Sequence, residues 1–262
     1  MTEPPTELVR YDVTAGVATI TLDFPAKGNA LSQSLMRELA ALIRTAQNDD
    51  SVRVVVLTHT GRVFCSGMDL SEAQDAGASD MGVHAFPAIL HSLSDSPKPV
   101  VARIAGSARA GGIGLIGACD LAVCVRSATF AFTEVRLGLI PAVISATVLP
   151  WLAPRAATEL FLTGAVFDGA RAAEIGLVNA AVEAEDLDRA TAAYVADLVK
   201  GGPIALGATK ALLRRALAPG MAANLDDLLE SSAHFFASEE GQEGIRAFGE
   251  KRPPRWVPAE PA

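Results

Sequence analysis

A glycine-rich segment at residues 109–120 constrains the fold of this chain more than any other stretch. The segment reads R-A-G-G-I-G-L-I-G-A-C-D and follows an apolar run at residues 99–104. Its small residues allow another part of the backbone to come very close, because glycine has no Cβ. A loop that leads from a strand into a helix also presents free backbone N–H groups, which suit an anion. The segment therefore predicts either a phosphate site or an oxyanion hole.

The first alternative is a dinucleotide site. Gly112, Gly114 and Gly117 spell G-x-G-x-x-G, and an acidic residue, Glu134, follows at a suitable distance. In a Rossmann unit, however, the helix continues well beyond the last glycine, whereas residues 120–125 here predict a new strand. This context favours an oxyanion hole, in which the N–H of Gly111 faces a carbonyl oxygen that becomes an enolate. Such a hole needs a second donor from elsewhere in the chain.

The composition limits the classes of protein to which the chain can belong. Its 262 residues, half of them hydrophobic, are enough for one large domain with a sizeable core. No apolar run has the length of a bilayer span, and the acidic first residues lack a signal sequence, so we expect a cytoplasmic protein with no membrane partner. A net charge of −8 disfavours a nucleic-acid partner. The three cysteines lack metal-ligand spacing, so no metal site is expected.

The order of the predicted elements indicates an α/β fold. Alternation at residues 8–13 and 17–23 predicts a β-hairpin, and Ser32 is a candidate N-cap for a helix that ends near residue 47. Buried strands are predicted at 54–58, 99–104 and 121–125, with a helix over 81–93 between the first two. Beyond Pro141 the pattern is helical, at 143–152, 156–162, 169–175, 187–198, 203–217 and 225–236. We therefore predict a core of residues 1–200 and a helical region of residues 201–262.

Seven motifs follow one another in an order that is typical of one superfamily. They are N-A-L at 29–31, G-R-V-F-C-S-G-M-D-L at 61–70, K-P-V-V-A at 98–102 with the glycine segment, T-F-A-F-T-E-V-R-L-G-L-I-P at 129–141, L-T-G at 162–164, A-E-I-G-L-V at 173–178 and E-G-I-R-A-F-G-E-K-R-P-P at 243–254. Over nearly its whole length the chain resembles the enoyl-CoA hydratase/isomerase (crotonase) superfamily.

The resemblance implies a fold, an assembly and a chemistry. The expected fold is a spiral of β-β-α units, with residues 201–262 as a helical trimerisation region, and the expected assembly is a homotrimer or a hexamer made of two trimers. The expected substrate is an acyl-CoA thioester, so coenzyme A is part of the substrate and no separate cofactor is implied. By position, the two oxyanion donors are the backbone N–H groups of Met68 and Gly111, and the catalytic acid or base is Glu134.

One departure from the superfamily concerns the second acid. In the two-glutamate hydratases a second glutamate lies three residues after the oxyanion glycine, where this chain has Gly114. Because Glu134 is followed by V-R-L-G-L-I-P-A-V-I-S, the chain is most similar to one-glutamate bacterial hydratases of the methylglutaconyl-CoA type. We expect hydration of a 2-enoyl-CoA in fatty-acid or branched-chain acyl-CoA catabolism. The alternatives are a Δ3,Δ2-enoyl-CoA isomerase and a non-catalytic acyl-CoA-binding subunit.

Further residues are implied in substrate binding by their positions. Arg109 or Arg136 is a candidate to bind a carboxylate on the substrate, and for Arg109 a structural salt bridge is the alternative. Asp69 is expected to accept from nearby backbone N–H groups. Contacts to the CoA nucleotide are expected from Lys27 and, from a neighbouring subunit, from Phe248 and Lys251. The complete set of expected substrate-binding residues is Lys27, Ala30, Ser66, Asp69, Leu70, Arg109, Gly114, Phe248 and Lys251.

Overall fold

A computed structural model describes residues 7–72, 85–217 and 221–255 of the chain, and its strands form two sheets. The larger sheet has six strands in the order β1-β2-β3-β5-β7-β10. The first two form the predicted antiparallel hairpin, and each later pair in this sheet is parallel. Its strands are β1 (Val9–Thr14), β2 (Val17–Leu22), β3 (Val54–His59), β5 (Val100–Ile104), β7 (Leu121–Val125) and β10 (Ala180–Val182).

The smaller sheet consists of very short strands and was not predicted from the sequence. Its order is β4-β6-β8-β9, for β4 (Val63–Cys65), β6 (Ser107–Arg109), β8 (Thr129–Ala131) and β9 (Phe167–Asp168). The chain enters the larger sheet at β3, β5 and β7, each time passes into the smaller sheet, and then forms a helix. These helices are α3 (Ala85–Ser94), α4 (Gly111–Ala118) and α5 (Ala142–Val148). This repetition is the β-β-α spiral that the resemblance implied.

Two of the helices predicted for the N-terminal half are found in the structure. The first, α1 (Gln33–Asn48), begins where Ser32 Oγ accepts a hydrogen bond from Leu35 N at 3.2 Å, which confirms the predicted N-cap. The helix predicted over 81–93 is found as α3, and residues 81–84 lie outside the described part of the chain. Pro87 lies within α3, which continues past it to Ser94.

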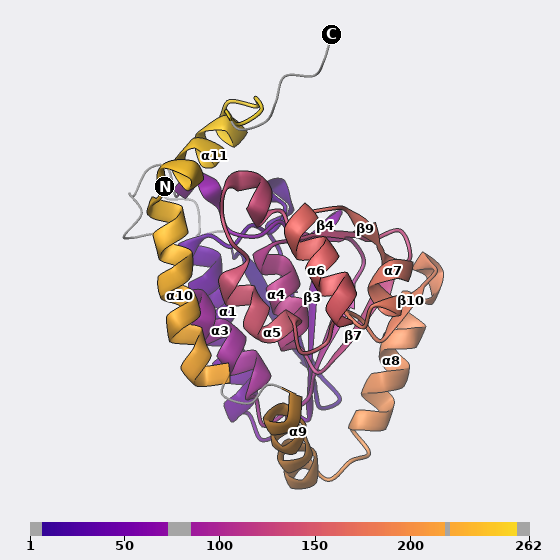
Figure 1. The fold of residues 1–262 in the computed structure, drawn as a ribbon. Coiled ribbons are helices and arrows are strands. Elements are labelled where there is room, and N and C mark those ends of the chain that lie inside the picture. Colours follow the sequence, from indigo (N-terminus) through magenta and orange to yellow (C-terminus); the bar gives the residue numbers. More distant parts are fainter. Residues whose placement is uncertain (1–6, 73–84, 218–220, 256–262) are drawn as a thin grey trace, which may run out of the picture.

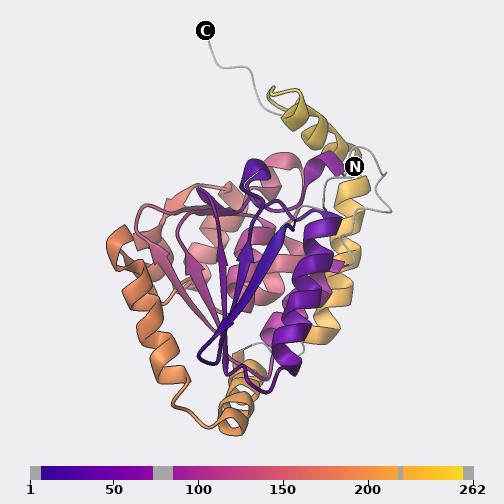
Figure 2. The same ribbon diagram turned by 180° about the vertical axis from the view of Figure 1, so that it is seen from behind.

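The C-terminal half is mainly helical, as predicted, but contains one strand of the larger sheet. That strand, β10, pairs with β7 and completes the sheet. Figures 1 and 2 show α10 along one side of the molecule, α8 along the other, and α9 and α11 at opposite ends. The remaining helices are η1 (Pro25–Lys27), η2 (Glu134–Leu137), α6 (Pro154–Thr163), α7 (Gly169–Glu174), η3 (Ala184–Asp186), α8 (Leu187–Leu198), α9 (Pro203–Leu217), α10 (Met221–Ala237) and α11 (Glu239–Gly249).

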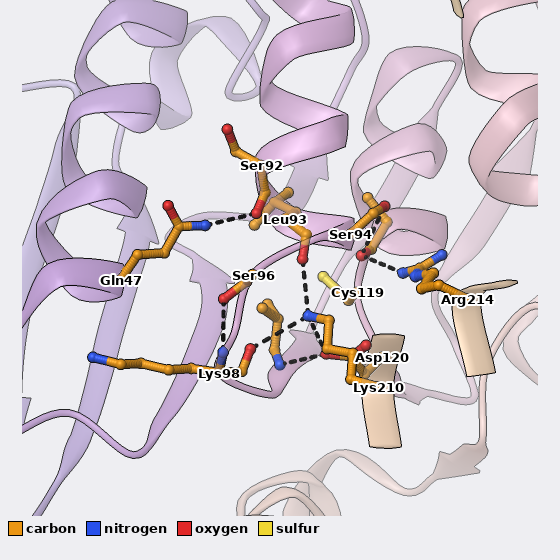
Figure 3. A network of polar contacts seen from close by, with 12 residues as sticks. Gln47, Ser92, Leu93, Ser94, Ser96, Lys98, Cys119, Asp120, Lys210 and Arg214 are labelled. Carbon is orange, nitrogen blue, oxygen red and sulfur yellow. Dashed lines mark hydrogen bonds and ion pairs between the residues drawn. The ribbon is translucent and has the colours of Figure 1, made fainter. Parts of the chain in front are cut away.

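A buried polar network fastens α9 to the core (Figure 3). The Lys210 ammonium lies 2.7 Å from Asp120 Oδ2 and donates to the carbonyl oxygen of Leu93 at 3.0 Å. One turn further along α9, Arg214 Nη2 donates to the carbonyl oxygen of Ala118 at 2.8 Å. These bonds tie α9 to the ends of α3 and α4, since both acceptor carbonyls belong to those helices. No helix in the described part of the chain is long and apolar enough to cross a membrane.

Candidate active site

A cavity of about 440 Å³ lies where the loops after β4, β6 and β8 meet the C-terminal helices. Parts of the chain that are far apart in sequence therefore share one site. Its walls combine an apolar surface with one carboxylate and two guanidinium groups. The lining residues are Ser66, Met68, Leu70, Arg109, Ala110, Thr133, Glu134, Arg136, Leu137, Leu139, Phe236 and Phe248.

The amide of Met68 is turned towards this cavity by a short parallel bridge to Leu31. Leu31 N donates to the carbonyl oxygen of Gly67 at 2.8 Å, and Asp69 N donates to the carbonyl oxygen of Leu31 at 3.3 Å. Because neighbouring amides of an extended chain point to opposite sides, the N–H of Met68 points away from Leu31. Within the described ranges this N–H has no hydrogen-bond acceptor.

The amide of Gly111 is the second free donor. Gly111 is the first residue of α4, so its N–H has no acceptor within the helix, and no other acceptor is found among the described residues. A Cβ added to Gly67 would lie 3.5 Å from Gly111 N, which places the two donor segments side by side. Two free amides next to each other at a cavity form the arrangement that an oxyanion hole requires.

Ala110, between Arg109 and the donor Gly111, has an unusual backbone conformation. Its φ is +46° and its ψ is −119°, a region that residues with a Cβ rarely adopt. Strain of this kind costs about 1 to 3 kcal/mol and is often found at functional sites. The surrounding fold therefore holds Ala110 in a conformation that it would not adopt by itself. This conformation sets the orientation of the peptide bond that carries the Gly111 N–H.

We predict that Ala110→Gly raises the free energy of unfolding by about 1 kcal/mol, since the relief of strain exceeds the entropy that a glycine adds to the unfolded chain. Urea denaturation measures this change. Ala184→Gly is the matched control, because Ala184 is exposed and has no positive φ, and it should lower stability slightly. A loss of stability in Ala110→Gly would show that packing of the methyl group outweighs the strain.

The glycines of the G-x-G-x-x-G run are explained by close packing of α4. A Cβ on Gly112 would overlap the carbonyl oxygen of Cys65 in β4, and one on Gly117 would lie 2.8 Å from the carbonyl oxygen of Thr147 in α5. The helix ends at Ala118, and β7 begins at Leu121, as the sequence context indicated. These glycines bring three backbones together, and their spacing needs no dinucleotide to account for it.

Gly114 does not line the cavity. A Cβ at this position would lie 2.6 Å from Ile144 Cγ2 and 3.5 Å from the ring of Phe86. The space in which a side chain of residue 114 would extend is thus filled by two apolar side chains. Glu134 is accordingly the one carboxylate among the residues that line the described cavity.

Glu134 lies three residues after the end of β8 and is the first residue of η2. Its Oε2 is buried and has no hydrogen-bond partner among the described residues. Burial raises the pKa of this carboxyl group to about 7, while a hydrogen bond from its own backbone N–H acts in the opposite direction. A group with a pKa near neutrality can both accept and return a proton at physiological pH.

Arg109 lines the cavity without forming an ion pair with any described residue. Its Nη1 donates to the carbonyl oxygen of Ala108 at 2.8 Å, and its Nη2 donates to Thr129 Oγ1 at 2.9 Å. Within the described ranges Arg109 therefore does not form the structural salt bridge that we considered, because its partners there are neutral oxygens. Burial lowers the pKa of Arg109. A cation at a cavity wall without a counter-ion is suited to an anionic group on a ligand.

Lys27 and Asp69 form an ion pair beside the cavity. Lys27 Nζ lies 3.0 Å from Asp69 Oδ2, and Asp69 Oδ1 accepts from Ser71 N at 3.0 Å. The second bond confirms the expectation that Asp69 accepts from nearby backbone N–H groups. The contact between Lys27 and a CoA nucleotide stays a prediction.

The other predicted residues divide into two groups. Ser66, Leu70 and Phe248 line the cavity, whereas Ala30 and Lys251 do not. Phe248 lines the cavity of its own chain because α11 packs back against η2, and its contact with the site of a neighbouring subunit stays a prediction. Sequence reasoning missed five lining residues, of which Ala110 lies within the glycine-rich segment. Thr133, Leu137 and Leu139 flank Glu134 in a motif that we recognised, whereas nothing in the sequence singled out Phe236.

The β-β-α spiral and a cavity with two free amides beside a buried carboxylate define an enzyme of the crotonase type. A sequence model of the enoyl-CoA hydratase/isomerase family matches residues 12–258. The chain belongs to this family.

Individual relatives agree with this assignment. A Thermus thermophilus protein provisionally named an enoyl-CoA hydratase is 35% identical over 247 residues, covering 92% of this chain and 97% of the relative. The carnitinyl-CoA dehydratase of Proteus mirabilis is 33% identical over 248 residues, with coverage of 92% and 94%. The crystal structure of an enoyl-CoA hydratase from Mycobacterium avium superimposes with a TM-score of 0.87 at 44% identity and covers 95% of this chain and 99% of that chain.

Proposed function

We propose that this protein adds water to the double bond of a 2-enoyl-CoA thioester. The observation that carries the proposal is the buried Glu134 carboxylate, whose Oε2 has no partner among the described residues. Glu134 lines the same cavity as Met68 and Ala110, and the amides of Met68 and Gly111 beside it have no acceptor among those residues. This reaction needs one group that transfers protons and two hydrogen-bond donors for the oxyanion that develops.

In the proposed mechanism, the thioester oxygen accepts hydrogen bonds from the N–H groups of Met68 and Gly111. Glu134 removes a proton from water, the water oxygen bonds to C3, and the π electrons move through C2 to the thioester oxygen, giving an enolate. The enolate then collapses, and C2 takes the proton from Glu134, which returns to its carboxylate form. Each oxyanion donor of this type contributes about 2.7 to 4 kcal/mol to stabilising the transition state.

A Δ3,Δ2-enoyl-CoA isomerase is the second candidate, and the packing around Gly114 supports it. Ile144 and Phe86 occupy the space in which a second carboxylate would stand. Isomerisation needs one proton carrier, since Glu134 would remove a proton from C2 of a 3-enoyl ester and return it to C4. Hydration by one carboxylate and isomerisation therefore use the same residues and differ in whether water is bound next to Glu134.

Product analysis with three esters tests these alternatives. The purified protein is incubated with crotonyl-CoA, 3-methylglutaconyl-CoA and a 3-enoyl-CoA, and water addition and double-bond migration are followed separately. We expect 3-hydroxyacyl products from at least one of the 2-enoyl esters. Migration without hydration would replace the proposal by the isomerase, and no turnover of any ester would leave only acyl-CoA binding.

We further propose that the preferred substrate carries a carboxylate on its acyl group, held by Arg109. The expected result is that Arg109→Met lowers kcat/KM for 3-methylglutaconyl-CoA by about 10- to 100-fold, the equivalent of one hydrogen bond to a charged group. Crotonyl-CoA is the control, because its acyl group has no carboxylate. Equal losses for both esters would assign Arg109 a structural role through its bonds to Ala108 and Thr129.

A further inference from the structure

A second apolar cluster, separate from the main core, connects the candidate site with the C-terminal helices. Its buried members are Leu139, Phe236 and Ile245. Leu139 follows η2, which carries Glu134, whereas Phe236 belongs to α10 and Ile245 belongs to α11. The partly buried residues that complete this cluster are Met68, Leu70, Leu137, Leu229 and Phe235.

Within this region, α11 touches η2 backbone to backbone. A Cβ added to Gly244 would overlap the carbonyl oxygen of Leu137 and would lie 2.9 Å from the Leu137 Cα. Gly138, which ends η2 with a φ of +67°, also lies close to Glu240, because a Cβ there would be 2.8 Å from the Glu240 carbonyl oxygen. At both positions only glycine allows this approach.

Ion pairs connect α11 to the segment that follows it. The carboxylate of Glu243 is buried and lies 2.7 Å from Arg252 Nη1 and 3.5 Å from Arg255 Nε. At the start of the helix, Ser238 Oγ accepts from Gly241 N at 3.0 Å. Since Glu243 directly precedes Gly244, these ion pairs tie the turn of α11 that contacts η2 to Arg252 and Arg255.

We propose that Gly244 is a positioning residue for Glu134: its backbone contact with Leu137 holds η2 in the place that keeps the Glu134 carboxylate inside the cavity. The helix α11 is then part of the active site, to which it also contributes the side chain of Phe248. The catalytic meaning of this inference rests on the proposed function, whereas the effect on the position of Glu134 does not.

Displacement of α11 should be visible as a change in the solvation of Glu134. Among the described residues, the charged groups that line the cavity together with this carboxylate are Arg109 and Arg136, and Glu240 on α11 lies against the end of η2. Burial is the cause that raises the pKa of Glu134 to about 7. If η2 moves outward and water reaches the carboxylate, its pKa falls towards the value of a solvated glutamate.

The test compares Gly244→Ala with Gly202→Ala in the full chain. Gly202 is the matched control because a Cβ there meets nothing closer than 3.7 Å. The pKa of Glu134 is measured by infrared titration of the carboxyl band, with Glu134→Gln as the background for each variant, and kcat/KM is measured against pH. We expect Gly244→Ala to lower this pKa by about one unit or more and kcat by about 10²-fold. Gly202→Ala should change neither.

A second variant guards against a failure to fold. Glu243→Gln keeps the shape of the side chain but removes the ion pairs with Arg252 and Arg255, so it should shift the pKa of Glu134 in the same direction by a smaller amount. A folded Gly244→Ala protein with an unchanged Glu134 pKa would overturn the inference. Absence of turnover in the wild type would count against the proposed function alone, because the infrared titration needs no substrate.

Discussion

Replacing Glu134 with glutamine should lower kcat by about 10²- to 10⁴-fold, the usual contribution of a general acid or base. Glutamine has the same shape but cannot take a proton from water. The KM should change little, because Glu134 Oε2 makes no hydrogen bond to the described part of the chain that the substitution would break. Steady-state kinetics on the best 2-enoyl ester measures both quantities.

Glu185→Gln is a suitable control for this experiment, because Glu185 is an exposed glutamate in η3. It should leave kcat unchanged. The Glu134→Gln protein should also unfold at the same temperature as the wild type or higher, since it no longer buries an ionisable group without a partner. Retention of full activity in Glu134→Gln would exclude Glu134 as the proton carrier.

The second large effect is expected from Gly67→Ala, which should lower kcat by about 10²- to 10³-fold, as does the loss of one oxyanion donor. Gly67 has a φ of +92°, and a Cβ there would lie 3.0 Å from Ala110 Cβ and 3.5 Å from Gly111 N. Relief of this contact has to move one or both donor segments. The new methyl group would also stand next to the position of the thioester oxygen.

Gly16→Ala separates this effect from general strain. Gly16, in the turn between β1 and β2, has a φ of +79°, and a Cβ there would meet Arg53 Cγ at 3.3 Å. Both variants should lose about 1 kcal/mol of folding free energy, because both place a Cβ in the left-handed region. Only Gly67→Ala should lose activity. An equal change of kcat in the two variants would argue against the oxyanion hole at Met68 and Gly111.

The parts of the fold that the sequence predicted are those with long periodic patterns. Such patterns predicted the hairpin, the helix capped by Ser32 and the buried strands β3, β5 and β7, and the structure confirms all of them. The strands β4, β6, β8 and β9 have two or three residues each, and a run of this length has no measurable period. They pair because the longer strands bring them together, which is tertiary information.

The helix α11 lies in the region 201–262 that was predicted to be helical, but it was not one of the helices predicted individually. The reason differs from that for the short strands. Gly241 and Gly244 lower its helix propensity, and both glycines are explained by contacts that only the folded chain reveals. A Cβ on Gly241 would overlap the carbonyl oxygen of Phe235, and one on Gly244 would overlap that of Leu137. Local propensity and tertiary packing oppose each other here, and packing prevails.

The candidate site was predictable only where a motif surrounded a residue. Met68, Gly111 and Glu134 come from separate motifs, and the structure brings their segments to one cavity. Phe236 lies within an ordinary amphipathic pattern of α10, which does not indicate which apolar side chain faces a ligand. Ile144 of α5 fills the space next to Gly114 of α4. This contact is made between two helices, so neither stretch of sequence alone could predict it.

The most direct test of the central claim is the incorporation of ¹⁸O from labelled water into the product of a 2-enoyl-CoA. Wild-type protein and Glu134→Gln are incubated with crotonyl-CoA or 3-methylglutaconyl-CoA in H₂¹⁸O, and the products are analysed by mass spectrometry. We predict a 3-hydroxyacyl-CoA labelled at its hydroxyl oxygen, formed by the wild type about 10² times faster or more than by the variant. Labelled product at the same rate from both proteins, or migration of the double bond without label, would contradict hydration by Glu134.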